Sequence, residues 1–299
     1  FPRDVAEVIE RHALQRYGMT ELVTDKKALE RLEPNMDLLR ALITFRSQLQ
    51  GEVLEAARRI IRTVVEELRN RLEPDIRRAL TGRLNRSRHT PHKLGRNFDA
   101  HGTIRKNLKH YDPVQQRLLI QIPKFFQRNT HHLPWTIVLC VDQSGSMVSS
   151  VIHAAVMAGI LAALPSVRLR LVVFDTSVVD LSDQVEDPVE VLMRVQLGGG
   201  TDIGQALRYC EGLVENPQRS VVVLISDFCE GASPIPLLGC CQRLHEGGVK
   251  LLGLAALGET ATPQYDRAMA EKLADRGMRV AALTPNRFAD WLAGVLHSK

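Results

Sequence analysis

The sequence predicts an α/β fold: a mostly parallel, doubly wound sheet preceded by a helical N-terminal region. Two observations support this. From residue 134 onward, short apolar runs alternate with segments of helical periodicity, and such alternation is typical of a parallel sheet covered by helices on both faces. Before residue 82, apolar residues instead recur at steps of three and four, which indicates amphipathic helices.

The chain of 299 residues divides into three parts. We expect a helical N-terminal region at 1–81, a basic linker or extension at 82–133, and an α/β domain at 134–299. Each part differs from the others in composition and periodicity. Because domains typically hold about 100–200 residues, this length suits one large domain or two.

The N-terminal region is predicted to contain a long amphipathic helix. Asn35 is placed to cap a helix that begins near Met36, since Asn favours the N-cap position. The apolar face of this helix continues for over thirty residues, and we expect Pro74 to interrupt it. A helix of this kind packs more often against its own domain than against a partner.

The extension is the most basic part of the chain. Between Arg77 and Arg128 there are 13 Lys and Arg residues but two Asp and Glu residues. Such a stretch suits an acidic protein surface, nucleic acid, or the acidic α/β domain of the same chain. We favour the two protein alternatives, because aromatic residues are few and no RNA- or DNA-binding motif is present.

Within the extension, the pattern predicts little regular structure. We expect a polar linker at 82–91, a short helix or strand at 103–111, and a strand at 117–122.

The α/β domain has a more regular pattern than the extension. Its expected strands are 136–142, 168–174, 177–181 (antiparallel, at the edge), 219–226, 249–256 and 278–283. Its expected helices are 147–163, 188–195, 202–214, 234–246, 264–275, and a last one capped by Asn286 and ending near 297.

Polar residues follow the predicted strands where a parallel sheet gathers its carboxyl ends. Asp142, Ser144 and Ser146 come directly after the first strand of the domain. Thr201 precedes a helix, and Asp227 ends a later strand. Ligands of open α/β sheets bind at this edge, and oxygen ligands suit Mg²⁺, with Mn²⁺ or Ca²⁺ as alternatives. We therefore predict that these five side chains bind one divalent cation.

Repulsion between two of these carboxylates favours the binding of a cation. Asp142 and Asp227 are expected on adjacent strands, where their like charges face each other. A divalent cation relieves that repulsion. Asp202 is expected to cap its helix rather than bind the metal.

The motif Asp142-x-Ser144-x-Ser146, followed by Thr201-Asp202 and then by Asp227, resembles the von Willebrand factor A domain. The resemblance covers residues 134–297 and implies a Rossmann-like fold with a metal-ion-dependent adhesion site. In that family the serines and the threonine bind the metal directly, and the aspartates bind it directly or through water. One coordination position stays open for a Glu or Asp of a protein partner.

A basic Thr103-Ile-Arg-x-x-Leu108 segment shortly before this motif narrows the resemblance to the bacterial CoxE-like proteins. In these proteins a helical, basic N-terminal region precedes the von Willebrand A domain. They are typically encoded beside MoxR-type AAA+ ATPases. The resemblance implies a partnership with such an ATPase in the remodelling or maturation of a client complex.

We therefore predict a non-enzymatic, Mg²⁺-dependent protein-binding module. The alternatives are a Mg²⁺-dependent phosphoryl hydrolase that uses Asp142, or nucleic-acid binding through residues 77–128. No membrane partner is expected, because by this reading no apolar stretch approaches the roughly 18 residues of a membrane span. The first residues lack the pattern of a signal peptide. The five cysteines form no disulfide or zinc pattern, which favours reduced thiols and a cytoplasmic protein.

Overall fold

The centre of the molecule is a six-stranded sheet with the order β10-β9-β8-β5-β6-β7. The computed structural model describes residues 29, 31–80, 84–91, 93, 95–113, 115–128, 135–165, 167–257 and 265–297. The strands of this sheet are β5 (Trp135–Asp142), β6 (Val167–Phe174), β7 (Val178–Asp180), β8 (Ser220–Ile225), β9 (Lys250–Leu257) and β10 (Arg279–Leu283). All neighbours pair in parallel except β7, which runs antiparallel to β6 at one edge. The predicted mostly parallel sheet with an antiparallel edge is confirmed.

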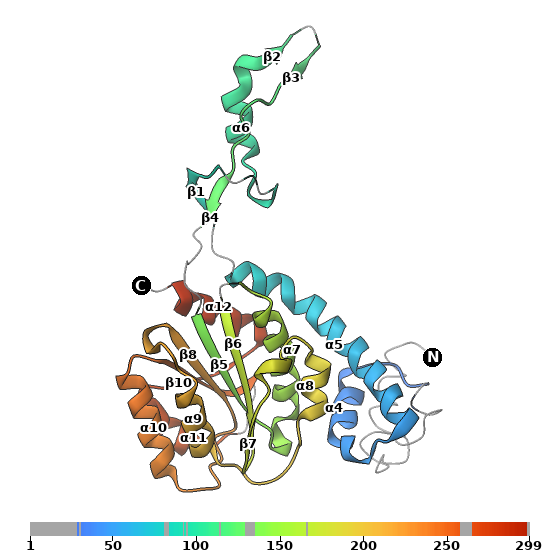
Figure 1. The fold of residues 1–299 in the computed structure, drawn as a ribbon, viewed down its shortest axis with the longest axis vertical. Coiled ribbons are helices and arrows are strands. Elements are labelled where there is room, and N and C mark those ends of the chain that lie inside the picture. Colours follow the sequence, from blue (N-terminus) through green and yellow to red (C-terminus); the bar gives the residue numbers. More distant parts are fainter. Residues whose placement is uncertain are drawn as a thin grey trace.

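Helices cover both faces of this sheet (Figure 1). They are α7 (Val148–Ala162), α8 (Pro188–Arg194), α9 (Ile203–Gly212), α10 (Pro234–Glu246), α11 (Arg267–Asp275) and α12 (Pro285–His297). Successive side chains of a strand point to opposite faces. Thus Ile137 and Leu139 of β5 join the core beneath α7, α8 and α12, whereas Val138 and Cys140 join the core beneath α9, α10 and α11. Every residue of β5 is buried, which explains its unbroken apolar run.

Two helices precede the sheet, α4 (Met36–Thr44) and α5 (Gly51–Leu80). Asn35 caps α4 as predicted, because its Oδ1 accepts a hydrogen bond of 2.8 Å from the Leu38 amide. The expected single helix is wrong, since a short 3-10 turn over Arg46–Gln48 separates α4 from α5.

Pro74 does not interrupt α5, contrary to the prediction. A proline inside a helix costs about 3 kcal/mol, partly through the missing hydrogen bond. Leu72, Ile76 and Leu80 are nevertheless buried before and after it along one face. Glu73 also binds both Arg69 and Arg77, one turn to either side. Packing and these ion pairs keep the helix continuous through the proline.

The N-terminal helices share their core with the α/β domain. Ile61, Val64 and Leu68 of α5 belong to the same buried cluster as residues of α7, α8 and α12. The expectation that the long amphipathic face packs against its own domain is therefore confirmed. The boundary near residue 81 does not separate two hydrophobic cores.

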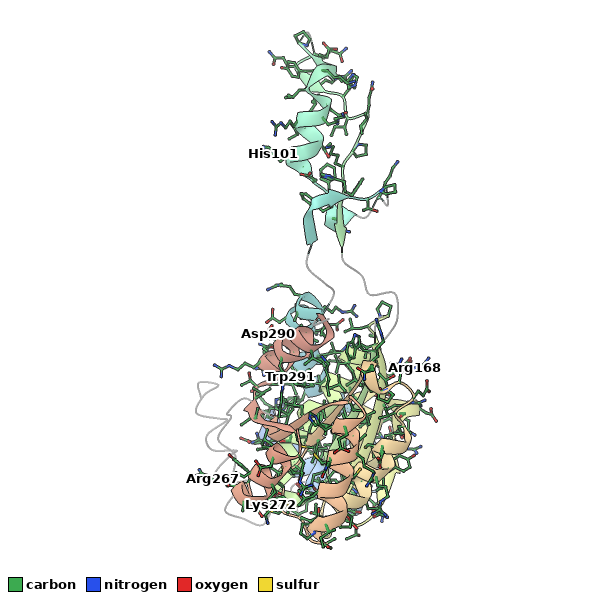
Figure 2. The ribbon with its side chains drawn as sticks, turned by 90° about the vertical axis from the view of Figure 1, so that its left-hand side faces the viewer. His101, Arg168, Arg267, Lys272, Asp290 and Trp291 are labelled. Carbon is green, nitrogen blue, oxygen red and sulfur yellow. The ribbon has the colours of Figure 1, made fainter. Side chains whose placement is uncertain are left out.

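The described part of the extension forms an arm that projects from one end of the α/β domain (Figures 1 and 2). We define the arm as residues 84–128. It consists of β1 (Leu84–His89), α6 (Ala100–Asn107), β2 (Tyr111–Asp112), β3 (Arg117–Leu118), β4 (Phe126–Arg128) and short 3-10 turns. Because the arm projects away from the α/β domain (Figure 1), the alternative of a contact between the basic segment and that domain of the same chain is not seen in the described residues of the arm.

Two predictions inside the arm are wrong. The expected linker at 82–91 contains the strand β1, because its backbone pairs antiparallel with β4 despite a polar composition. The expected strand at 117–122 is reduced to the two residues of β3. Beyond it, the Asn107 side chain binds the backbone at Gln121 and Ile122, and these bonds replace a strand partner.

The expectation that no stretch is apolar enough to span a membrane is also wrong. Residues Gly145–Ala162 form a stretch long and apolar enough to cross a membrane, contrary to the sequence-based expectation. This stretch is α7 with the turn before it, and 72% of it is buried inside the fold. Its apolar character is explained by its position between the sheet and the helices α5 and α8, whose residues it contacts.

The last helix begins two residues earlier than expected from a cap at Asn286. Pro285 is its first residue, a position that suits proline because its fixed φ is helical and no amide hydrogen is needed there. The Phe288 amide donates to the Thr284 carbonyl at 2.9 Å. Asn286 therefore lies inside the first turn and is not the cap.

Candidate metal centre

Four of the five predicted ligands lie in one hydrogen-bonded chain at the carboxyl ends of β5 and β8. The Ser144 amide donates to Asp142 Oδ1 at 2.8 Å. The hydroxyls of Ser144 and Ser146 lie 3.2 Å apart. Ser146 Oγ donates to Asp227 Oδ2 at 2.7 Å. Asp142 and Asp227 are 85 positions apart in the sequence. The parallel pairing of β5 with β8 brings them to the same edge of the sheet.

Asp142 is the buried member of this group. Its side chain is fully buried, and its Oδ2 accepts a hydrogen bond of 2.8 Å from Ser226 Oγ. Burial raises the pKa of Asp142, and the negative charge of Asp227 adds to that rise. The carboxylate is therefore in an environment that disfavours an uncompensated negative charge.

The turn after β8 is strained in a way that fixes Asp227. Phe228 follows it with φ 60°, a left-handed conformation that costs non-glycine residues on the order of 1–3 kcal/mol. The Phe228 ring is fully buried and meets Tyr265 edge to face. The Phe228 amide donates to Ser226 Oγ, and the Cys229 amide donates to Asp227 Oδ1. The strained turn thus holds the second carboxylate toward Ser146.

Thr201, the fifth predicted ligand, comes to the same end of the sheet from a glycine-rich loop. The Gly198 amide donates to the carbonyl of Gln143, the residue after Asp142, at 3.2 Å. The Gly231 amide, in the loop after Asp227, donates to the Thr201 carbonyl at 2.9 Å. Backbone contacts from both neighbouring turns therefore position Thr201. Among the described residues, its hydroxyl forms no hydrogen bond with the other four side chains.

Asp202 caps α9, as the sequence predicted. Its Oδ1 accepts from the Gln205 amide at 2.7 Å. Glu230 binds the same helix end, because its carboxylate accepts from the Ile203 amide at 3.0 Å. Burial raises the pKa of Glu230, and the nearby charge of Asp202 adds to the rise.

Oxygen atoms make up the whole predicted donor set, and this chemistry fits a hard cation such as Mg²⁺. Two carboxylates and three hydroxyls supply two negative charges. Within the described part of the chain, no group of three or more His, Cys, Asp or Glu side chains could hold a metal. The hydroxyls are therefore needed to complete any metal site here. The residues present fit Mg²⁺ better than they fit a soft, sulfur- or imidazole-bound metal.

Sequence reasoning missed the residues that support this group. Gln143 is buried, and its Oε1 accepts from the Gln196 amide at 3.0 Å in addition to its backbone contact with Gly198. Ser226 connects Asp142 to the backbone of Phe228. Ser226 could have been predicted as a supporting residue, because it directly precedes Asp227 at the end of the strand. No feature of the sequence indicates a supporting role for Gln143.

Replacing Gly231 should disturb Thr201 specifically. A Cβ atom at Gly231 would lie 2.7 Å from the Thr201 carbonyl oxygen, so Gly231→Ala must move the two loops apart. We expect Mg²⁺ affinity to fall about tenfold, since losing a supporting contact of a metal site typically costs 10–100-fold. Calorimetric titration with Mg²⁺ measures this. Gly239→Ala is the matched control, because its Cβ would meet only the end of Arg243 at 3.7 Å. Equal affinities in both variants would contradict the prediction.

The arm is a second surface of unusual composition. Seven of its large apolar side chains are 41–58% exposed; they are Phe98, Ile104, Leu108, Tyr111, Leu119, Ile120 and Ile122. Its buried side chains are mostly polar. Thr103 and Asn107 bind the backbone of the 121–124 segment, and Asp99 binds His89 at 2.8 Å. This inverted distribution, with polar residues inside and apolar residues outside, is typical of a surface that docks onto a partner.

A doubly wound sheet of this order, with an Asp-x-Ser-x-Ser turn at its carboxyl end, defines the class of von Willebrand A domains. The chain belongs to the family of VWA domain containing CoxE-like proteins, whose family model matches residues 68–292. The match begins within α5 and includes the arm. Domains of this class serve in protein–protein interaction.

The chain is also similar to an Escherichia coli (strain K12) protein described as uncharacterized protein YehP. The two are 48% identical over 299 residues, which is all of this chain and 79% of that protein. Among solved structures, BatB from Bacteroides thetaiotaomicron is 14% identical, with a TM-score of 0.43 over 55% of this chain and 100% of its own. The von Willebrand domain of the Porphyromonas gingivalis pilus tip protein Mfa5 is 12% identical, with a TM-score of 0.43 over 57% and 99%.

Proposed function

We propose that the chain is a non-enzymatic, Mg²⁺-dependent protein-binding module that works with a MoxR-type AAA+ ATPase. The observation that carries the proposal is the chain of contacts from Asp142 through Ser144 and Ser146 to Asp227. A Mg²⁺ ion held there relieves the repulsion between the two carboxylates. Held by these side chains, the ion would supply a positive charge that attracts an acidic side chain of the partner.

The buried state of Asp142 supports a binding role over a catalytic one. A phosphoryl hydrolase that uses this residue as nucleophile needs a carboxylate oxygen that reaches the substrate. Both oxygens of Asp142 instead accept hydrogen bonds inside the protein, from Ser144 and Ser226. The rest of the ligand set consists of hydroxyls and a second carboxylate, which suits ion binding.

The arm supplies a second contact that does not depend on metal. β5 begins at the end of the α/β domain from which the arm projects (Figure 1) and ends at Asp142. Its eight residues span roughly 25 Å. The arm and the candidate metal centre therefore lie at opposite ends of the sheet. This separation suits an adaptor that holds the ATPase with one surface and the client complex with the other, in the remodelling or maturation of that client.

We place this activity in the cytoplasm. The five cysteines are all free, and four of them are buried. Burial also raises the pKa of Cys240 to about 12 and that of Cys241 to about 11, so these thiols stay protonated and unreactive at neutral pH. Such cysteines suit a reducing compartment.

The first experiment measures binding to a purified MoxR-type ATPase from the same genome by calorimetry, once with Mg²⁺ and once with EDTA. Binding that disappears with EDTA supports the metal-dependent contact. Binding that is unchanged by EDTA moves the ATPase contact to the arm. Metal-dependent phosphate release without a partner would support the hydrolase alternative, and steeply salt-dependent retention on DNA or RNA would support nucleic-acid binding.

The arm's contact is tested by removing exposed apolar groups. Ile104 and Leu108 lie one helical turn apart on the same side of α6 and its 3-10 extension. Ile104→Ser with Leu108→Ser should weaken the EDTA-insensitive binding at least tenfold, because buried apolar anchors dominate such interfaces. Ile235→Ser is the matched control, since Ile235 is 78% exposed on α10. Thermal unfolding should be unchanged in both variants. Full binding by the arm variant would contradict the proposed contact.

A further inference from the structure

The arm carries a cavity of about 600 Å³ beside α6. Its described lining includes three permanent cations, those of Arg105, Lys106 and Lys124, and one carboxylate, that of Asp99. Asp99 Oδ2 lies 2.8 Å from His89 Nε2, and its Oδ1 accepts from a backbone amide of α6 at 2.8 Å. Both oxygens of this carboxylate are therefore bound within the arm, and cations outnumber it among the described lining residues.

The cations differ in how closely they lie to this carboxylate. The hydrogen bond with His89 lowers the pKa of Asp99, and the charge of Lys124 adds to that effect. Lys124 thus interacts with Asp99 inside the arm and is half-buried. Arg105 and Lys106 are exposed on α6. These two side chains are the ones that a partner reaches first.

Two stripes run side by side along the exposed part of α6 and the 3-10 turn that continues it. Arg105 and Lys109, four positions apart, form a basic stripe, with His101 one turn before them (Figure 2). Ile104 and Leu108 form an apolar stripe, and their side chains are 49% and 58% exposed. Residues three or four apart are neighbours on a helix surface. Leu108 therefore lies beside Arg105, and Ile104 beside His101.

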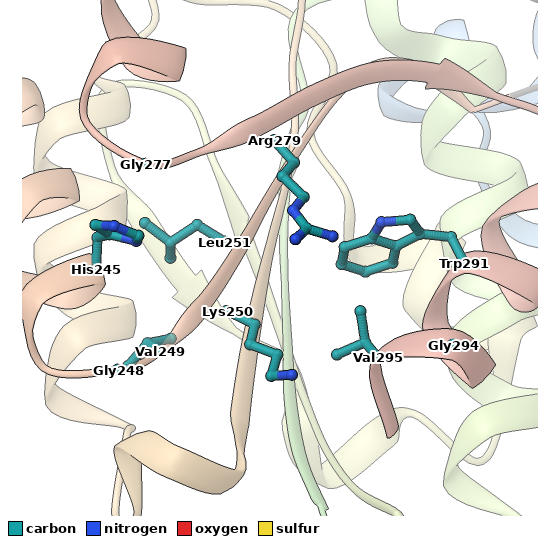
Figure 3. Close-up of a pocket in the computed structure, with 10 residues that line it drawn as sticks. All are labelled: His245, Gly248, Val249, Lys250, Leu251, Gly277, Arg279, Trp291, Gly294 and Val295. Atoms are coloured by element: carbon teal, nitrogen blue, oxygen red, sulfur yellow. The ribbon is translucent and has the colours of Figure 1, made fainter. Parts of the chain in front are cut away.

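A second charged cavity, of about 500 Å³, lies in the α/β domain between β9, β10 and α12 (Figure 3). Its lysine already has a contact inside the domain, because the Lys250 ammonium lies 5.6 Å from the ring centre of Trp135. The cavity of the arm lies instead on a part of the chain that projects from the domain (Figure 1). A partner can reach the arm without displacing contacts of the α/β domain.

The charge of the arm limits what can occupy this surface. Residues 84–128 hold ten Lys and Arg residues against two Asp and Glu residues. Like charges therefore oppose the pairing of two arms, so the arm of a second copy does not fit. Nucleic acid matches the charge, but its phosphates and sugars offer little apolar surface to Ile104 and Leu108. The two stripes together match a partner that is acidic along one side and apolar along the next.

We propose that the arm binds an acidic amphipathic helix of a protein partner, which lies along α6. Its apolar side chains pack on Ile104 and Leu108, and its carboxylates bind Arg105 and Lys106 at the cavity. Two helices suit each other because both repeat their stripes with a pitch of about 5.4 Å. A guanidinium group also binds a carboxylate with two parallel hydrogen bonds. This inference rests on the proposed contact of the arm and names what that contact recognises.

The test is a titration of the full chain into a fluorescein-labelled synthetic helix in which Leu and Glu form neighbouring stripes. EDTA is present throughout, so that carboxylates of the peptide cannot bind at a metal ion. We expect saturable binding, followed by fluorescence anisotropy, that weakens as salt screens the charges. A peptide with every Leu replaced by Ser has the same charge. It should bind roughly tenfold more weakly or less, because apolar anchors dominate such interfaces.

Two substitutions on the arm locate the charged contact. Arg105→Gln should weaken binding of the Leu–Glu peptide about tenfold, as expected for losing a charge-assisted hydrogen bond. Arg117→Gln is the matched control, because Arg117 is exposed on β3 and is not among the described residues that line the cavity. It removes the same charge from the same arm. Unfolding midpoints check that both variants remain folded.

Several results would overturn the proposal. Equal affinities for the Leu–Glu and Ser–Glu peptides would remove the apolar stripe from the contact. Equal peptide affinities in Arg105→Gln and Arg117→Gln would remove the cavity. Tighter binding of a single-stranded oligonucleotide than of the Leu–Glu peptide would assign the arm to nucleic acid. Retention on phosphatidylglycerol vesicles that the peptide does not displace would assign it to a lipid surface.

The same experiment separates this inference from the proposed function. Because EDTA is present, failure of peptide binding leaves the proposed metal-dependent contact untouched. Peptide binding that depends on Arg105, beside an ATPase that does not contact the arm, would support the acidic helix and assign it to another protein, such as the client.

Discussion

The Ser144→Ala, Ser146→Ala double variant is expected to lose Mg²⁺ binding while keeping its fold. The two hydroxyls lie 3.2 Å apart between the carboxylates of Asp142 and Asp227. Without them, the remaining donors cannot surround a hard cation that demands near-octahedral oxygen coordination. Affinity should fall by about 100-fold or more, since even supporting residues of metal sites cost 10–100-fold. Binding of an acidic partner at the metal should disappear with it.

Calorimetric titration of the free protein with Mg²⁺ measures this effect without any partner. Ser149→Ala is the matched control, since it removes a serine hydroxyl in the first turn of α7, just beyond the predicted ligands. Ser144 is half-buried and Ser146 is exposed, so we expect the unfolding midpoint of the metal-free protein to stay nearly unchanged. Mg²⁺ should raise the midpoint of the wild type and of Ser149→Ala, but not that of the double variant. An equal rise in all three would contradict the proposed ligands.

The contacts among Asp142, Ser144, Ser146 and Asp227 were readable from the sequence for a definite reason. Each lies at or directly after the end of a buried strand, and parallel strands gather those ends at one edge. The parallel pairing of β5 with β8 then places the ends of these two strands side by side. The placement of Thr201 was less accessible. It depends on the close approach of Gly231 and on the bond between Gly198 and Gln143, and such loop contacts leave no periodic pattern.

The structure of the arm was not predicted because its apolar side chains are exposed and its polar side chains are buried, the reverse of the usual distribution. Periodicity arguments assume that apolar side chains point inward, yet Ile104 and Leu108 point to solvent, whereas Thr103 and Asn107 are fully buried. Backbone groups of the 121–124 segment bind these two polar side chains. The strand β1 was missed for a related reason, since polar residues in a two-stranded ribbon show no alternation of apolar and polar positions.

Truncating Ile61 should destabilise the α/β domain as a whole. Ile61 lies in the first half of α5 and is fully buried, in the cluster that includes α7 and α12. Ile61→Ala leaves a cavity there, and such changes cost about 2–5 kcal/mol. If the helical region and the sheet share one core, this loss must lower the stability of both. Ile60→Ala, at the half-buried neighbouring position, should cost clearly less.

The natural fluorescence of the chain makes this measurable. Trp135 begins β5 and Trp291 lies on α12, so both tryptophans report on the α/β domain, whereas the substitution is in α5. Denaturant unfolding followed by tryptophan fluorescence should shift to a lower midpoint in Ile61→Ala, together with the loss of helical circular dichroism. An unchanged fluorescence transition beside an earlier loss of helix would mean that residues 1–81 fold separately. The packing of α5 on α7, α8 and α12 would then contribute little to the stability of the sheet.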